Sequence, residues 1–401
     1  MDKVIIAILV YNKEIFNIMA SFFTKYYFSS DQKSSHNPAL DGLRGLAVLL
    51  VVLAHLSNNK ILLFEFLNFG GIGKSGVYLF FLLSSYLLDR QIVLAIKSGN
   101  SKVYYWVNYF LRRFLRIYPL YIFLLIAYYI IHKMGYEYCI CMRNIKVIFY
   151  HLTLKQGNGL FWSIPVEFKY YFLSPLIILI YAKVLRWNKL LILLLTMAGI
   201  CYISYFTYTN GYFKKTEIST WPYLPVFLLG SLIAVFQVLL SIKVKTKIVK
   251  YSMVIDIIGL IALFLCFILG AGYFFRILVP IEYRFVFSIY RRLIIVQGFV
   301  FMLILLSTIY GKGIMSSIFS FKPLRFIGVI SFSIYLTHFP VLKFVKDINI
   351  DKYGSELRFT LFFILTIAIS MITYHLIEYP FSKIKVFEND KLFRSKAEEG
   401  S

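Results

Sequence analysis

Residues 41–57 read DGLRGLAVLLVVLAHLS, an apolar stretch with a charged start and a histidine near its end. About 20 mostly apolar residues in a helix cross the roughly 30 Å of hydrocarbon in a bilayer. Ionisable side chains in such a stretch are costly in lipid and mark functional positions by default. Arg44 and His55 share one face of the predicted helix, about 16 Å apart along its axis. The stretch therefore predicts a membrane-spanning helix with one functional face.

The composition of the whole chain is that of a membrane protein. Of its 401 residues, 60% are apolar and 15% are charged, whereas soluble domains have about 45–50% and about 25%. Lys and Arg outnumber Asp and Glu 43 to 19, which gives a net charge of +24. These basic residues lie in short gaps between apolar runs, as in the loops of multi-span membrane proteins. They do not cluster on a polar domain, and we therefore exclude nucleic acid as a partner.

Ten stretches are long and apolar enough to span a bilayer, and they predict an all-α, polytopic integral-membrane helical bundle of about ten transmembrane helices. They cover residues 41–57, 73–90, 114–132, 162–183, 190–208, 222–241, 252–274, 290–309, 325–345 and 358–379. We expect residues 40–381 to form one transmembrane domain. Residues 1–39 form an N-terminal cytoplasmic or interfacial segment, in which an amphipathic helix and disorder remain alternatives. Residues 382–401 form a cytoplasmic polar tail.

The distribution of positive charge predicts the orientation of the bundle. An even number of spans puts both termini on one side of the membrane. With both termini inside, the inner segments carry 25 Lys and Arg residues and the outer loops carry 16. Because cytoplasmic loops are enriched in these residues, we expect both termini to be cytoplasmic. Arg44 then lies at the cytoplasmic entrance and His55 near the middle of the membrane.

The four cysteines give no disulfide or metal framework. Cys139 and Cys141 are too close for an easy disulfide, and no His or carboxylate stands at metal-ligand spacing from them. We expect all four to act as small apolar side chains, and we expect no metal.

His55 allows two interpretations when the residues are considered alone. A histidine that titrates near neutral pH is a common general base for a hydroxyl group. A buried histidine that is hydrogen-bonded to a nearby backbone carbonyl is the structural alternative. Periodicity alone does not name a reaction.

The motifs around these residues resemble the membrane acyltransferase-3 family of bacterial O-acyltransferases. LDGLRGLA at 40–47, followed by His55, is similar to the opening of that family. Further blocks follow in the family's order: GGIG at 70–73 with GVYLFFLLS at 76–84, RRFLRIYPLY at 112–121, WSIPVE at 162–167, SIYLTH at 333–338 and EYPF at 378–381. The chain departs from the family pattern at Lys74, Ser85 and Tyr379, where the last replaces a usual basic residue.

The resemblance implies a stand-alone O-acyltransferase of the bacterial inner membrane. Such an enzyme moves an acyl group, most often acetyl, from cytoplasmic acyl-CoA to a hydroxyl of a cell-surface glycan or of a lipid-linked glycan precursor. The resemblance implies three partners: acyl-CoA, which in this family is most often acetyl-CoA, the saccharide acceptor, and the lipid bilayer. A polytopic glycolipid transporter or flippase is the alternative, but transporters often have two related halves, which are not visible here.

The same resemblance assigns roles to particular residues. Arg113 and Arg116, with Arg112 beside them, are candidates for binding the CoA phosphates at a cytoplasmic helix end, and the alternative is a positive-inside anchor. Glu167 orients the acceptor or the catalytic histidine, or else pairs with Lys169 or with an arginine of another span. The catalytic candidates are His55, Arg44 and Glu167, and the further candidates are Asp41, His338, Glu378, Trp162 and Ser163. His338 lies about 21 Å along its span, where a core histidine is the alternative.

Overall fold

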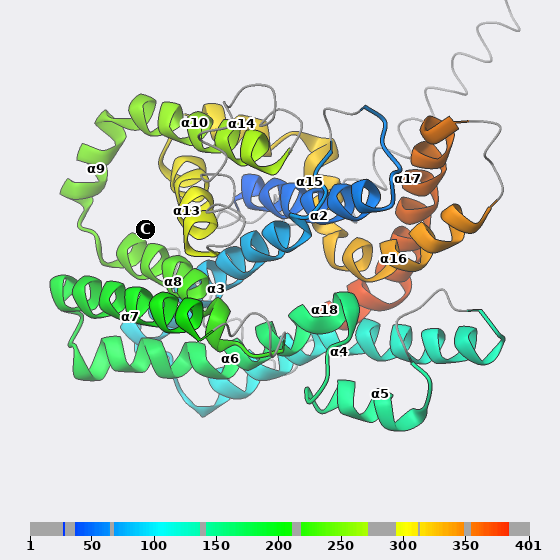
Figure 1. The fold of residues 1–401 in the computed structure, drawn as a ribbon. Coiled ribbons are helices and arrows are strands. Elements are labelled where there is room, and N and C mark those ends of the chain that lie inside the picture. The colour runs from blue at the N-terminus through cyan, green and yellow to red at the C-terminus, as the bar shows by residue number, and fades with distance from the viewer. Residues whose placement is uncertain are drawn as a thin grey trace, which may run out of the picture.

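The computed structural model describes residues 27–28, 37–64, 68–136, 142–210, 218–271, 294–311, 313–348 and 354–384 (Figure 1). Within these ranges the chain is helical and contains no strand. The predicted all-α fold class is therefore confirmed. Most of the predicted N-terminal segment, most of the polar tail, and Cys139 and Cys141 lie outside the described residues. Of the two described cysteines, Cys201 is exposed and Cys266 is buried.

Eight helices of the described chain are long and apolar enough to cross a membrane. Five of them are single helices: α2 (Pro38–Asn58), α3 (Gly73–Lys97), α4 (Val103–Lys133), α7 (Lys189–Thr209) and α10 (Ser252–Gly270). The other three are built from consecutive segments. Gly159–Val184 contains η3 (Gly159–Trp162), α6 (Ser163–Leu179) and η4 (Ile180–Val184); Trp221–Leu239 contains η6 (Trp221–Tyr223) and α8 (Leu224–Leu239); and Gly354–Ser382 contains α17 (Gly354–Thr373), η9 (Tyr374–Glu378) and α18 (Tyr379–Ser382). The predicted polytopic helical bundle is confirmed.

The other two predicted spans have a different form. The stretch 325–345 is a pair of helices, α15 (Lys322–Val329) and α16 (Ser331–Asp347), which meet at an angle of 78° and make one bent span at most. The stretch 290–309 corresponds to α13 (Ile294–Tyr310), which is apolar but has only 17 described residues. The remaining helices are short: α5 (Ile145–Leu152), α9 (Ile242–Lys250) and α14 (Ile314–Phe319).

Close backbone packing holds α15 flat against α2. A side chain at Gly328 would collide with the carbonyl group of Asp41, and one at Gly45 would collide with the carbonyl group of Leu324. Helices in membranes use such small residues to bring their backbones together. The bend after Val329 therefore lets α15 lie along α2 while α16 leaves in another direction.

Helices α2, α3 and α8 form the centre of the bundle. In the most apolar window of α2, 78% of the residues are buried, compared with 28% in α7, α10 and the helix Gly354–Ser382. Figure 1 shows α2 and α3 in the middle of the bundle, with α7, α10 and α17 around them. Gly230 of α8 packs against Ser85 of α3, whose hydroxyl donates to the Leu82 carbonyl at 3.0 Å. The serine that departs from the family pattern is thus accommodated by a glycine on the neighbouring helix.

Candidate active site

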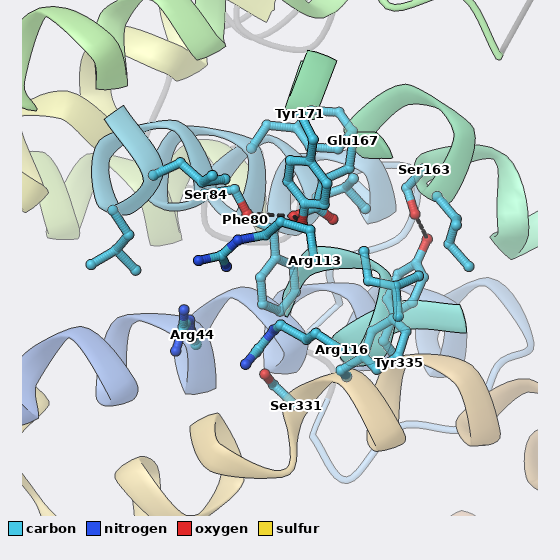
Figure 2. A pocket seen from close by; sticks show the side chains of 17 residues that line it. Arg44, Phe80, Ser84, Arg113, Arg116, Ser163, Glu167, Tyr171, Ser331 and Tyr335 are labelled. Atoms are coloured by element: carbon cyan, nitrogen blue, oxygen red, sulfur yellow. Dashed lines mark hydrogen bonds between the residues drawn. The ribbon is translucent and has the colours of Figure 1, made fainter. Parts of the chain in front are cut away.

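A pocket lies between α2, α3, α4, α6 and α16 (Figure 2). Three arginines line it: Arg44 from α2, and Arg113 and Arg116 from α4. Figure 2 shows their guanidinium groups pointing toward the same cavity. We call this cavity the arginine pocket. Among the other sequence candidates, Glu167 and Ser163 also line it.

The two arginines of α4 lie farther from the start of their helix than the apolar pattern predicts. The helix begins at Val103 and not near residue 114, so Arg113 and Arg116 lie about 15 and 20 Å from its first residue. Residues three apart lie on the same face of a helix, and this face turns toward the pocket. The two arginines therefore do not lie at the terminus of α4, because the apolar window marks only part of a 31-residue helix.

Glu167 is fixed by two hydroxyl groups. Its Oε1 atom accepts from Ser84 Oγ at 2.5 Å and from Tyr171 Oη at 2.7 Å. The predicted alternative, a pair with Lys169, is wrong, because Lys169 Nζ donates to the carbonyl of Ile218 at 3.0 Å. A carboxylate held by two donors in this way is an ordered negative charge among three arginines.

The lining of the pocket carries more positive than negative groups, namely three guanidinium groups and one carboxylate. Arg44 also pairs with Asp41, with 3.7 Å between Nη1 and Oδ1. Glu378 is buried behind the pocket, where its Oε2 accepts from Ser333 Oγ at 2.7 Å and where Arg116 and Arg44 act on it electrostatically. A cavity with excess positive charge and low-dielectric walls concentrates anionic ligands.

The two candidate histidines form a pair, which the sequence did not predict. His55 Nδ1 lies 3.0 Å from His338 Nε2, although 283 residues separate them in the chain. His55 lies in the last turn of α2. His338 is fully buried and lies about 10 Å along α16, not about 21 Å along one straight span, because the helix pair is bent. Neither histidine lines the arginine pocket.

Tyr335 lies between the histidine pair and the arginine pocket. It lines the pocket, and its ring centroid is 6.0 Å from that of His338. Ser163 Oγ donates to Tyr335 Oη at 2.9 Å, and Tyr335 Oη donates to the Leu160 carbonyl at 2.6 Å. One layer of side chains therefore separates the pocket from the histidine pair.

The remaining sequence candidates lie outside the pocket. Arg112 is exposed on α4. Trp162 is buried and packs against Phe81 and Tyr223, with ring centroids 5.9 and 5.0 Å away. Lys74, which departs from the family pattern, places its Nζ 5.2 Å from the centroid of the Trp162 ring.

Sequence reasoning missed three residues of the site: Ser84, Tyr171 and Tyr335. Ser84 ends the quoted block 76–84 and Tyr335 lies inside the block 333–338, so both were available as signals. Their hydroxyl groups gave no reason to select them among the many serines and tyrosines of the chain. Among the described residues, no group of three or more His, Cys, Asp or Glu side chains could hold a metal ion.

A cationic pocket and a nearby histidine pair inside a bundle of apolar helices are features of a polytopic membrane enzyme. The sequence profile of the acyltransferase domain matches residues 37–375, and the chain belongs to this family, acyltransferase-3. This membership agrees with the expectation from the sequence motifs.

Two curated relatives are similar over most of this chain. The peptidoglycan O-acetyltransferase OatA of Listeria monocytogenes is 26% identical over 394 residues, which cover 90% of this chain and 58% of the relative. The O-acetyltransferase OatA of Staphylococcus aureus is 25% identical over 372 residues, which cover 86% of this chain and 57% of the relative. The chain thus spans less than two thirds of these relatives. No solved structure matches it significantly. Family and relatives favour an O-acyltransferase over the transporter or flippase alternative.

Proposed function

We propose that this protein transfers an acyl group, acetyl in the first instance, from cytoplasmic acyl-CoA to a hydroxyl of a cell-surface glycan or of its lipid-linked precursor. The family and the two acetyltransferase relatives support acyl transfer. The name of the Listeria relative makes peptidoglycan the first acceptor to test. The proposed location is the bacterial inner membrane, with both termini in the cytoplasm.

The observation that carries this proposal is the convergence of Arg44, Arg113 and Arg116 on one cavity. CoA carries a diphosphate and a ribose phosphate, and a guanidinium group binds phosphate through two parallel hydrogen bonds. An arginine that only anchors a helix at the membrane surface has no reason to line an internal cavity 15–20 Å into that helix. We therefore assign the phosphates of the donor to the arginine pocket.

His55 is the proposed general base of the transfer. It lies about 16 Å from Arg44 along the same helix, so a donor with its phosphates at the arginines extends its pantetheine arm past Tyr335 toward His55. His55 takes the proton of the acceptor hydroxyl, and the oxygen attacks the thioester carbonyl. The carbon–sulfur bond breaks, the thiolate of CoA leaves, and it takes up the proton that His55 holds. An ester and free CoA are the products.

Glu167 has a different proposed role from the one first considered. It contacts Ser84 and Tyr171 within the arginine pocket, and it acts electrostatically on Arg44. This position supports a role in holding the arginines in place for the donor, rather than in orienting the acceptor or His55.

The test uses membranes from cells that express the wild-type chain or the His55→Ala variant. Acetyl-CoA and soluble peptidoglycan fragments are added, released CoA is measured with a thiol reagent, and acetylated fragments are measured by mass spectrometry. We expect acceptor-dependent CoA release by the wild type and a loss of about 10²–10⁴-fold in the variant. Full product from a correctly inserted His55→Ala protein would exclude His55 as the base. A wild type that never releases CoA with any glycan would contradict acyl transfer.

A further inference from the structure

The geometry of the histidine pair points to a positioning role for His338: we propose that it fixes the tautomer of His55, so that Nε2 of His55 is the atom that accepts the proton. This inference rests on the proposed function, because it concerns the atom through which the base acts. His338 itself is kept away from the substrate by its complete burial.

The backbone of α16 sets the tautomer of His338. His338 Nδ1 lies 3.1 Å from the carbonyl oxygen of Ile334. A carbonyl oxygen can only accept a hydrogen bond, so Nδ1 of His338 carries the hydrogen. The ring is fully buried, and a positive charge there would need a partner to offset the loss of water. A neutral ring carries one hydrogen only, which leaves a lone pair on Nε2 of His338.

The lone pair on His338 Nε2 fixes the tautomer of His55. His338 Nε2 lies 3.0 Å from His55 Nδ1, and a hydrogen bond at this distance needs one donor. Because Nε2 of His338 accepts, Nδ1 of His55 donates. The neutral His55 ring then has its own lone pair on Nε2. The ring of Phe339, 5.8 Å away and nearly perpendicular, packs against His55 and helps to fix its orientation.

A glycine, which has no side chain, lies beside His55 Nε2. Gly73 is the first residue of α3, and a Cβ atom built there would lie 3.4 Å from both Nε2 and Cδ2 of His55. That is the distance at which a methyl group fills the space next to the ring. The atom with the free lone pair therefore borders the position where the chain has no side chain, and we assign this position to the acceptor hydroxyl.

The hydrogen bond to His338 also stabilises the protonated form of His55 that arises during the reaction. When His55 Nε2 takes the proton, the ring becomes positively charged and its Nδ1 hydrogen continues to donate to His338. In a Ser–His–Asp triad a carboxylate orients the base in the same way. Here the acceptor is a neutral ring, which orients the base without adding a buried charge.

The first experiment compares His338→Leu with His338→Gln in the acetyl-CoA and peptidoglycan-fragment assay. Leucine fills space but accepts no hydrogen bond, whereas the amide oxygen of glutamine can accept from His55 Nδ1. We expect His338→Leu to lower kcat about 10–100-fold, as is usual when the partner that orients a reactive group is lost, with the KM for acetyl-CoA unchanged. His338→Gln should be about tenfold faster than His338→Leu, which is the effect of one hydrogen bond of about 1.4 kcal/mol. A purely structural role predicts that leucine is tolerated at least as well as glutamine, and that result would overturn the proposal.

The second experiment tests the space beside Nε2 and does not depend on His338. Gly73→Ala should raise the KM for the glycan or lower kcat by at least tenfold, while donor binding stays unchanged. Gly199→Ala is the matched control, because a Cβ atom at Gly199 of α7 meets nothing within 4 Å. Equal activity of the two alanine variants would contradict the assignment of the acceptor to Nε2.

The two proposals fail in different ways. If His55→Ala is inactive but His338→Leu and Gly73→Ala are fully active, the base remains and the positioning role is excluded. If His55→Ala is itself active, the proposed function of His55 fails first.

Discussion

Replacing Arg116 by alanine should weaken the binding of acyl-CoA without disturbing the fold of the helix bundle. Arg116 lines the arginine pocket and lies one helical turn from Arg113, whose Nη2 atom is 3.5 Å from Gln91 Oε1. That contact is at the limit of a hydrogen bond, so it does not commit the Arg113 guanidinium group to a protein partner. Both guanidinium groups can therefore turn to the phosphates of a donor.

The expected increase in the Kd for acyl-CoA corresponds to the loss of one arginine–phosphate contact. Removal of one charge-assisted contact costs about 1.5–3 kcal/mol, which corresponds to a tenfold to hundredfold increase in Kd. The loss is partial because Arg44 and Arg113 remain. Arg116→Lys should recover only part of the affinity, because an ammonium group keeps the charge but lacks the planar pair of donors.

The chain offers a matched control on the same helix. Arg112 is exposed and does not line the pocket, although it is adjacent to Arg113 in the sequence. The purified Arg116→Ala, Arg116→Lys and Arg112→Ala proteins are titrated with acetyl-CoA by calorimetry after correct insertion has been verified. Arg112→Ala should bind as the wild type does. If Arg112→Ala and Arg116→Ala bind acetyl-CoA equally well, the arginine pocket is not the donor site.

Three further predictions concern charge, orientation and pH. Glu167→Gln keeps an oxygen for Ser84 and Tyr171 but removes the negative charge that holds the arginines in place, so the KM for acetyl-CoA should rise while the protein remains folded. An unchanged KM for acetyl-CoA would leave Glu167 a structural role only. A reporter that is active only outside the cytoplasm, fused at residue 390, should stay inactive, because the 25-to-16 charge bias places the C-terminus inside. Burial lowers the pKa of His151 to about 4, and Tyr121 Oη lies 2.9 Å from its Nδ1. The His151 ring gains a proton near pH 6.5 in the unfolded protein but only near pH 4 in the folded protein, so the stability of the fold should fall as the pH is lowered through this window. Melting curves at pH 7 and pH 5 should show a smaller fall for His151→Gln than for the wild type.

The sequence by itself determined most of the helices and the alignment of Arg44 with His55 along one of them. Apolar length predicted the spans, and the 3.6-residue period placed Arg44 and His55 on one face of α2, because both properties depend only on neighbours in the chain. The order of the motifs predicted the family in the same way. These features need no information about which helices touch.

Only the tertiary structure decided which faces meet. Lipid is as apolar as a leucine-rich core, so hydropathy cannot distinguish the face of a helix that meets lipid from the face that meets another helix. For this reason the sequence could not pair Ser84 with Glu167, which are 83 residues apart, or His55 with His338, which are 283 apart. The 78° bend between α15 and α16 sets the direction of α16, and it depends on the packing of glycine backbones on α2. A hydropathy window cannot register a contact of that kind, because it averages over neighbours along one chain segment.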